Sequence, residues 1–149
     1  MAKKGKDKQK SGLAGELFVA AELLKRGFQV SLTFGSAKAI DLFVYNEKID
    51  HTFNVQVKTL RKSNCYLLSP EKVRRDFVYV FVLLNDIGEY PEYFILTGEE
   101  ILADRELFGS SLQPGKLPGI NIGPLRRKYK NRWEVFEKMI GIHSDLIKK

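Results

Sequence analysis

The stretch that decides the fold is residues 40–60, IDLFVYNEKIDHTFNVQVKTL. Its two flanks, residues 40–45 and 52–60, are rich in apolar β-branched and aromatic residues, which is typical of β-strands. The polar residues 46–50 between them predict a turn and therefore an antiparallel hairpin. Asp41 begins the first strand, and Gln56 and Lys58 interrupt the second. Because residues two apart share one face of a strand, Gln56 and Lys58 point the same way, and strand pairing can bring Asp41 to that face.

Three further strands are expected, at residues 28–34, 77–84 and 92–96, which completes a five-stranded sheet. Residues 77–84 are apolar on both alternating faces, as in a buried central strand. Residues 97–100, TGEE, match the capping box of a helix that runs to about Phe108. Residues 109–124 hold four glycines and three prolines, which predicts a loop.

Two amphipathic helices frame these strands. After a possible cap at Ser11, an apolar stripe predicts that one helical face packs on the core. That stripe consists of Leu13, Leu17, Ala20 and Leu24, and Gly27 can end the helix. A second stripe near the C-terminus consists of Tyr129, Trp133, Phe136 and Ile140. The order predicts an α/β fold in which helices flank a central mixed five-stranded sheet.

Length and composition bound the class of protein. The chain of 149 residues fits one domain, expected at residues 11–149 behind a flexible basic arm at residues 1–10. Cys65 is the only cysteine, which excludes an intramolecular disulfide and a cysteine-based zinc cluster and favours a reducing cytoplasm. The longest apolar run, residues 77–84, is far shorter than the roughly 20 residues of a membrane span. We therefore expect a soluble cytoplasmic protein with no membrane partner.

The formal charge of +7 belongs to the two ends of the chain. Residues 1–10 carry +4 and residues 125–149 carry +5, which leaves −2 on the body. Basic ends indicate a polyanion partner, although solvated basic segments have the same composition. The candidate phosphate contacts are Lys38, Arg61, Lys62, Arg74, Arg75, Arg126, Arg127 and Lys128.

Glu16 is the fourth polar residue of interest. At about 100° per residue it falls on the shoulder of the predicted buried stripe, whereas Glu22 falls on the solvent side. Two partly buried acids, an amide and a lysine are costly to gather without compensation. A hard divalent cation such as Mg²⁺ offsets that cost because it takes carboxylate and amide oxygens. Lys58, while protonated, cannot ligate a metal but can stabilise an anionic oxygen or orient an attacking water.

These residues resemble the PD-(D/E)xK nuclease superfamily, which includes archaeal Holliday junction resolvases and Mrr-like enzymes. The resemblance rests on Glu16 in an opening helix, on AID with Asp41, and on QVK with Gln56 and Lys58. It implies a restriction endonuclease-like core in which Glu16, Asp41, Gln56 and the Val57 carbonyl hold Mg²⁺ and Lys58 acts on water. Mn²⁺ is expected to substitute. The implied activity is hydrolysis of phosphodiester bonds in DNA rather than RNA, structure-selective or non-specific, and a homodimer is possible.

The sequence departs from the family pattern at two positions. Ile40 stands where the motif has proline, a common variation, and Gln56 stands where it has an acid, as in Mrr-like members. The amide keeps a ligating oxygen but removes one negative charge, which leaves the number of metal ions open. Two alternatives therefore stay beside the nuclease hypothesis: a non-catalytic nucleic-acid-binding module of the same fold, and a protein-interaction domain.

Overall fold

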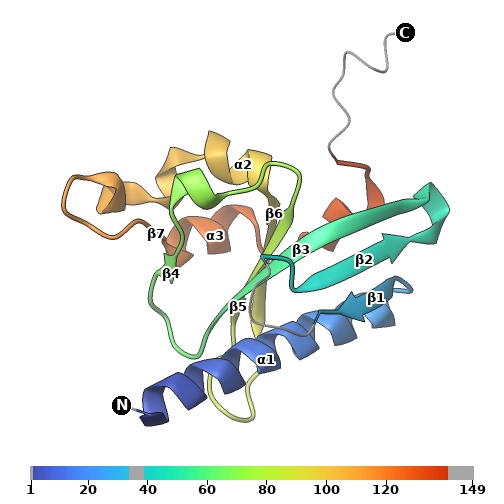
Figure 1. The fold of residues 1–149 in the computed structure, drawn as a ribbon, viewed down its shortest axis with the longest axis horizontal. Helices are drawn as coiled ribbons and strands as arrows, with labels where there is room; N and C mark the ends of the chain where they lie inside the picture. The colour runs from blue at the N-terminus through green and yellow to red at the C-terminus, as the bar shows by residue number, and fades with distance from the viewer. Residues whose placement is uncertain (1, 34–38, 141–149) are drawn as a thin grey trace, which may run out of the picture.

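The computed structural model describes residues 2–33 and 39–140, and Figure 1 shows its arrangement. A five-stranded sheet in the order β1-β2-β3-β5-β6 forms its centre. The strands are β1 (Gln29–Leu32), β2 (Leu42–Asn46), β3 (His51–Leu60), β5 (Val78–Leu83) and β6 (Glu92–Thr97). Only the β3–β5 pair is parallel among these neighbours, and the other pairs are antiparallel. The predicted mixed α/β architecture and its central hairpin are therefore confirmed.

Different elements cover the two faces of the sheet. The helix α1 (Ala2–Lys25) and a 3₁₀ helix (Trp133–Glu137) pack on one face around a core that includes Val55 and Val57. The helices α2 (Gly98–Ala103) and α3 (Ile122–Lys128) build the second core with Phe81 and Phe94. A two-stranded ribbon, β4 (Tyr66–Leu67) with β7 (Gly119–Ile120), lies beside them (Figure 1). The capping box of α2 is formed as predicted, with Thr97 and Glu100 bonding each other's backbone N–H groups.

The packing of α1 differs from the expected one in two ways. Its buried side is formed by Gly15, Val19, Ala20 and Leu23. Ala20 of the predicted stripe is thus buried as expected, whereas its three leucines are about half exposed, namely Leu13, Leu17 and Leu24. A Cβ on Gly15 would lie 1.8 Å from Thr59 Oγ1, so the absence of a side chain lets the helix approach β3 closely. The helix also begins at Ala2 instead of Ser11, because lysine, alanine and glutamine in residues 2–10 favour helix. The segment expected to be a basic arm thus forms the first turns of α1.

The C-terminal part also departs from the expectation. Instead of one helix through Tyr129 and Ile140, α3 begins earlier and ends at Lys128, and a 3₁₀ helix holds Trp133 and Phe136. Asn131 interrupts the helix with a left-handed φ of 56°. The predicted loop at residues 109–124 is likewise shorter, since it contains β7 and the start of α3.

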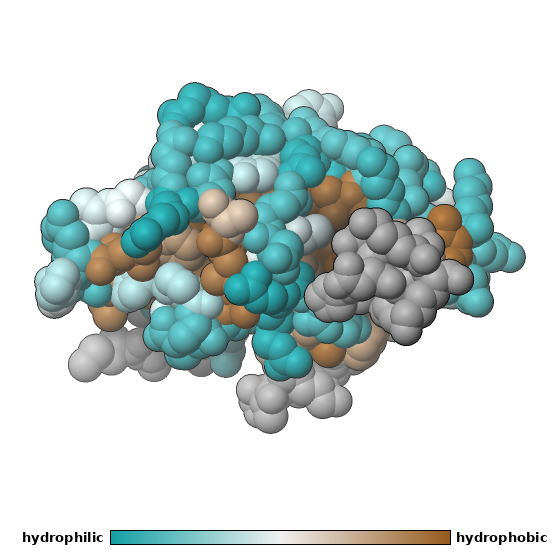
Figure 2. Space-filling view, turned by 90° about the horizontal axis from the view of Figure 1, so that it is seen from above, coloured by the Kyte–Doolittle hydropathy of each residue, from teal (hydrophilic) through white to brown (hydrophobic). Residues whose placement is uncertain are grey.

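The surface mixes hydrophilic and apolar side chains. Seen from the α2 side, Figure 2 shows apolar surface between hydrophilic side chains. Large exposed apolar residues include Leu67 at 58% and Leu117 at 77% of full exposure. Within the described ranges, no helix is both long and apolar enough to cross a membrane.

Candidate active site

Asp41 lies where β2 begins, at the margin of the sheet. Its backbone N–H donates to the Val55 carbonyl at 2.8 Å, which extends the β2–β3 ladder by one bond. On the N-terminal side of Asp41 the chain no longer pairs with β3. The Asp41 carboxylate accepts the N–H of Val57, the next residue of β3 on this side, at 2.7 Å. Because the N–H and C=O groups of a strand residue point to the same side, the Val57 carbonyl also faces this gap. The carboxylate is thereby fixed next to the Val57 carbonyl, which the family resemblance implies as a metal ligand.

Glu16 approaches Asp41 from α1. The close contact of Gly15 with Thr59 brings this part of the helix onto β3. Burial, together with the negative charge of Asp41, raises the pKa of the Glu16 carboxyl to about 6, and burial is the larger cause. Burial also raises the pKa of Asp41, against the Val57 hydrogen bond and the charge of Lys58, which lower it. Two half-buried carboxyl groups from different elements are therefore close enough to interact through their charges, and the pKa of each is raised.

Gln56 and Lys58 share one face of β3, as predicted, while Val55, Val57 and Thr59 form the other face, against which α1 packs. Lys58 is half-buried, and burial lowers its pKa. Asp41 raises that pKa and Lys72 lowers it, so Lys58 lies between an acid and a second base. Glu16, Asp41 and Lys58 are thus linked electrostatically.

The residues fit a hard cation in chemistry. Glu16 and Asp41 would supply carboxylate oxygens, and the Val57 carbonyl would supply a third oxygen from the same gap. The Gln56 amide belongs to the face of β3 opposite to the one that α1 covers, so its ligation stays a prediction. Within the described residues no three His, Cys, Asp or Glu side chains gather at one point. The raised pKa values of both acids also favour a bound cation, because a divalent ion lowers the free energy needed to ionise the two carboxyl groups together.

The predicted phosphate contacts near the site fall into different surroundings. The Arg61 Nε donates to Ser11 Oγ of α1 at 2.6 Å, and Arg75 pairs with Glu99 at 3.1 Å. The Arg74 guanidinium lies over the Phe77 ring, 5.2 Å from its centroid. Lys62 is exposed. Lys38, which the sequence nominates, falls outside the described residues.

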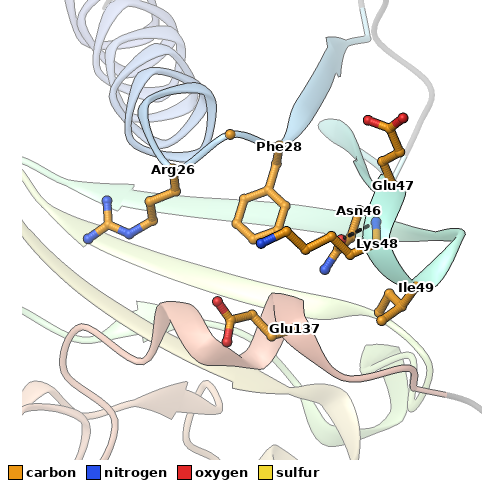
Figure 3. Close-up of a pocket in the computed structure, with 8 residues that line it drawn as sticks. Arg26, Phe28, Asn46, Glu47, Lys48, Ile49 and Glu137 are labelled. Carbon is orange, nitrogen blue, oxygen red and sulfur yellow. Dashed lines mark hydrogen bonds between the residues drawn. The ribbon is translucent and has the colours of Figure 1, made fainter.

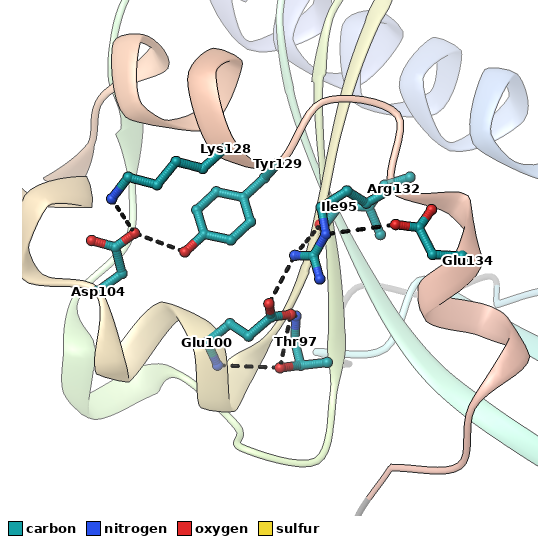
Figure 4. Close-up of polar contacts among 8 residues, drawn as sticks. All are labelled: Ile95, Thr97, Glu100, Asp104, Lys128, Tyr129, Arg132 and Glu134. Carbon is teal, nitrogen blue, oxygen red and sulfur yellow. Dashed lines mark hydrogen bonds and ion pairs between the residues drawn. The ribbon is translucent and has the colours of Figure 1, made fainter.

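The C-terminal basic segment, residues 126–132, is engaged in ion pairs with acids of β6 and α2 and of the segment that follows α2. Arg126 makes a bidentate pair with Glu92, 2.9 Å at both contacts. Lys128 pairs with Asp104 and Glu106, at 2.8 and 2.7 Å, and Arg127 also pairs with Glu106. Figure 4 shows the Lys128–Asp104 contact and the neighbouring Arg132–Glu100 pair. The positive charge that the sequence places here is therefore largely matched by acids, which is not visible in a count of basic residues.

Two adjoining cavities flank Lys58, and the sequence pattern indicates neither. One, of about 390 Å³, is lined by Lys8 of α1, Lys58 and Leu67 among others. The other, of about 230 Å³, is lined by Lys58, Leu67, Lys72 and Leu117 among others. We call the two together the Lys58 groove. A separate cavity of about 370 Å³ lies at the end of α1, between Arg26, Lys48 and Glu137 (Figure 3), and contains none of the candidate site residues.

Comparisons with known proteins add little to this geometry. No known family matches the sequence, and no curated protein matches it. Among solved structures, a bacterial homing endonuclease, I-Ssp6803I, matches over 63% of this chain and 67% of that chain. The identity is 18% and the TM-score is 0.46, a level at which the likeness carries no weight for fold or function. The function has to be argued from the site itself.

Proposed function

We propose that this chain is a Mg²⁺-dependent nuclease of the PD-(D/E)xK type, which hydrolyses phosphodiester bonds in DNA. One observation carries the proposal: the half-buried Asp41 interacts electrostatically with both the half-buried Glu16 and the half-buried Lys58, and the pKa of each of the three groups is shifted. Clusters of perturbed titratable groups beside a groove are typical of active sites. Glu16, Asp41 and Lys58 also belong to the motif on which the family resemblance rests.

In the proposed reaction, a water oxygen forms a bond to phosphorus while the bond from phosphorus to one sugar oxygen breaks. The water gives up one proton and the leaving sugar oxygen takes one up, so the products are a phosphate end and a hydroxyl end. A Mg²⁺ ion held by Glu16, Asp41, Gln56 and the Val57 carbonyl would supply Lewis-acid polarisation and a more acidic water. The Val57 N–H fixes the Asp41 carboxylate for this task. Mn²⁺ is expected to replace Mg²⁺ because it accepts the same oxygen ligands.

Lys58 has a role that needs no metal ligation. Its ammonium group can donate a hydrogen bond to the attacking water and balance the negative charge that builds up on the phosphate oxygens. Burial and Lys72 lower its pKa, which brings it closer to the range where a lysine can also exchange a proton. Partial burial limits competing solvent, which strengthens both effects.

The test is cleavage of supercoiled, linear, branched and single-stranded DNA by the purified chain with Mg²⁺, with Mn²⁺ and with EDTA. We expect cleavage only with metal, and its loss in Asp41→Asn and Glu16→Gln. Glu47→Gln is the matched control, because Glu47 is an exposed acid at the tip of the β2–β3 hairpin. Absence of metal-dependent cleavage on every substrate contradicts the catalytic proposal.

The alternatives give different outcomes in the same experiments. Gln56, which removes one acid from the site, favours a non-catalytic module, and that module would bind DNA without cleaving it and would keep its affinity in Asp41→Asn. A protein-interaction domain would show no salt-dependent DNA binding at all. Homodimerisation also remains a prediction. The half-exposed Leu13 and Leu17 of α1 give it a candidate face, and sedimentation of Leu17→Glu beside the parent chain tests it.

A further inference from the structure

The Lys58 groove continues from the candidate site along the side of the molecule that carries the β4–β7 ribbon (Figure 1). Its two cavities share Lys58 and Leu67. Lys8 lines one of them, and Lys72 lines the other. Of the described residues, none that lines either cavity is an aspartate or a glutamate. Asp41 acts on Lys58 from outside the cavities, whereas no acid of the described residues lines either cavity beside Lys8 or Lys72. Cations in such a setting are complementary to a phosphate backbone.

Two exposed leucines form the apolar part of this groove. Leu67 is 58% exposed and Leu117 is 77% exposed, and both line the cavity that also contains Lys58 and Lys72. Leu67 belongs to β4, and Leu117 lies just before β7, the strand that pairs with β4. Large aliphatic side chains so far out of the core carry a hydration cost, which a contact with bases removes.

The ribbon holds these leucines rigidly. Next to them, Tyr66 and Ile120 are opposite each other in the ribbon and are buried in the second core. Ser111 Oγ accepts the Gly119 N–H at 3.1 Å, and its hydroxyl donates to the Phe108 carbonyl at 2.6 Å, which ties β7 to the 3₁₀ turn before it. A Cβ on Gly119 would lie 3.1 Å from Cys65 Sγ and 3.2 Å from the Tyr66 carbonyl oxygen, so the absence of a side chain favours the close approach of the two strands. A fixed apolar edge beside a row of cations is suited to bases that are not stacked in a duplex.

We infer that the Lys58 groove holds one unpaired DNA strand, with Lys8 and Lys72 on its phosphates and with Leu67 and Leu117 against its bases. This deepens the proposed function, on which it rests, because it places the substrate strand next to Lys58. The substrate class is DNA with a splayed or unpaired segment, such as a fork or a flap. A fully paired duplex offers its phosphates to the lysines but hides its base faces from the leucines.

The experiment measures binding without cleavage, in EDTA, by fluorescence anisotropy. The probes are a forked DNA with two single-stranded arms and a fully paired duplex that contains the same labelled strand. We expect the fork to bind about tenfold more tightly than the duplex, since an unpaired strand can use both the cationic and the apolar part of the groove. Equal affinities for the two probes overturn the inference.

Two double variants test whether the preference for forked DNA comes from the groove. The double variant Leu67→Ser/Leu117→Ser is expected to bind the duplex as before and to lose the preference for the fork. The matched control, Ile87→Ser/Tyr90→Ser, removes two other strongly exposed apolar side chains, from the β5–β6 loop, and should keep the preference. Both changes affect exposed side chains, and thermal unfolding verifies that the variants fold. A preference that survives in the groove variant overturns the inference.

Two further outcomes are separated by design. If the leucines instead bind a second copy of the chain, the groove variant lowers the sedimentation coefficient and leaves fork binding unchanged, which contradicts the inference. If the chain binds forks but never cleaves DNA, the proposed catalysis fails while the groove assignment stands. Because binding is measured in EDTA, the two failures are distinguishable.

Discussion

The C-terminal basic segment and the Lys58 groove carry the same kind of charge in opposite settings. Arg126, Arg127 and Lys128 of the segment are paired with acids, whereas Lys8 and Lys72 line cavities in which no acid among the described residues takes part. The segment has the higher density of basic residues in the sequence, yet its charges tie α3 to β6 and to the chain that follows α2. A basic residue contacts DNA readily only when folding leaves its charge unmatched, so the groove is the better candidate for DNA binding.

The largest difference between the two regions is expected in catalysis. Lys58→Met should lower the rate of DNA cleavage by at least about 100-fold, because it removes a cation next to the reacting phosphate. Lys130→Met is the matched control from the basic segment, where Lys130 pairs with Glu92 at 3.2 Å. Its cleavage rate should stay within about threefold of the parent chain. Single-turnover cleavage measures both, and similar losses in the two variants would mean that Lys58 has no special role.

A smaller effect is expected on affinity. The double variant Lys8→Met/Lys72→Met should bind DNA about tenfold more weakly at moderate salt, and its slope of log affinity against log salt should be shallower by about 1.5. Arg126→Met/Arg127→Met should change the slope less, because those guanidinium groups are already neutralised by acids. Salt titrations in EDTA measure both slopes. If the arginine pair changes the slope more, the comparison between the two regions is wrong.

Substitutions in the basic segment should instead change the free energy of unfolding. Arg126, with Lys130, lowers the pKa of Glu92 to about 2 by direct hydrogen bonds. A lowered carboxyl pKa stabilises the folded chain above pH 4.5, and that contribution is lost as the pH falls towards 2. Arg126→Met should therefore lower the free energy of unfolding by about 1 kcal/mol at pH 7, and less near pH 3. Urea unfolding at the two pH values measures this, and an effect independent of pH would point to a cause other than the ion pair.

The smallest effect concerns the stability that the folded chain loses when Glu16 of the candidate site is ionised. With the pKa of Glu16 raised to about 6, the folded chain retains a proton that the unfolded chain releases above pH 4.5. The free energy of unfolding thus decreases as the pH rises from 4.5 to 6. Glu16→Gln should remove this decrease and stabilise the metal-free chain at pH 7 by about 1 kcal/mol or less. Urea unfolding in EDTA tests it, and a variant less stable than the parent at pH 7 argues against a strained acid pair.

Local patterns predict the sheet well because its determinants are local. Alternating apolar residues and a polar turn are enough for the β2–β3 hairpin, and the fully apolar residues 77–84 are enough for the central strand β5. The pairing of the hairpin then brings the Asp41 carboxylate to the Val57 N–H and within electrostatic range of Lys58, and this part of the candidate site follows from the strand pattern. The side-chain direction of Glu16 also follows, since either apolar face of α1 leaves it near the core.

The face of α1 could not be predicted, because the helix has two apolar stripes. Leu13, Leu17 and Leu24 are the more hydrophobic set, but Gly15 and Val19 form the face that packs. What decides between them is a close contact with Thr59, 44 residues further along the chain. A hydrophobicity pattern predicts that the large apolar residues are buried, and it does not indicate where a glycine permits close approach of a helix to a strand.

Long-range pairing explains the other differences. The left-handed conformation of Asn131 ends the expected C-terminal helix, and the ion pairs of Arg126 and Lys128 depend on acids that are distant in sequence. The exposed positions of Leu67 and Leu117 likewise follow from the pairing of β4 with β7, across about 50 residues. Such features arise from the assembled fold and have no local signal in the sequence.

The central claim is that Glu16, Asp41, Gln56 and the Val57 carbonyl hold a divalent cation beside Lys58. A crystal of the chain soaked in Mn²⁺ tests this most directly, with data collected at the manganese absorption edge. We predict an anomalous peak about 2.0–2.3 Å from oxygens of Glu16 and Asp41, absent from a soaked crystal of Asp41→Asn. An empty site with the two carboxylates turned apart, or a manganese ion bound elsewhere, would contradict the claim.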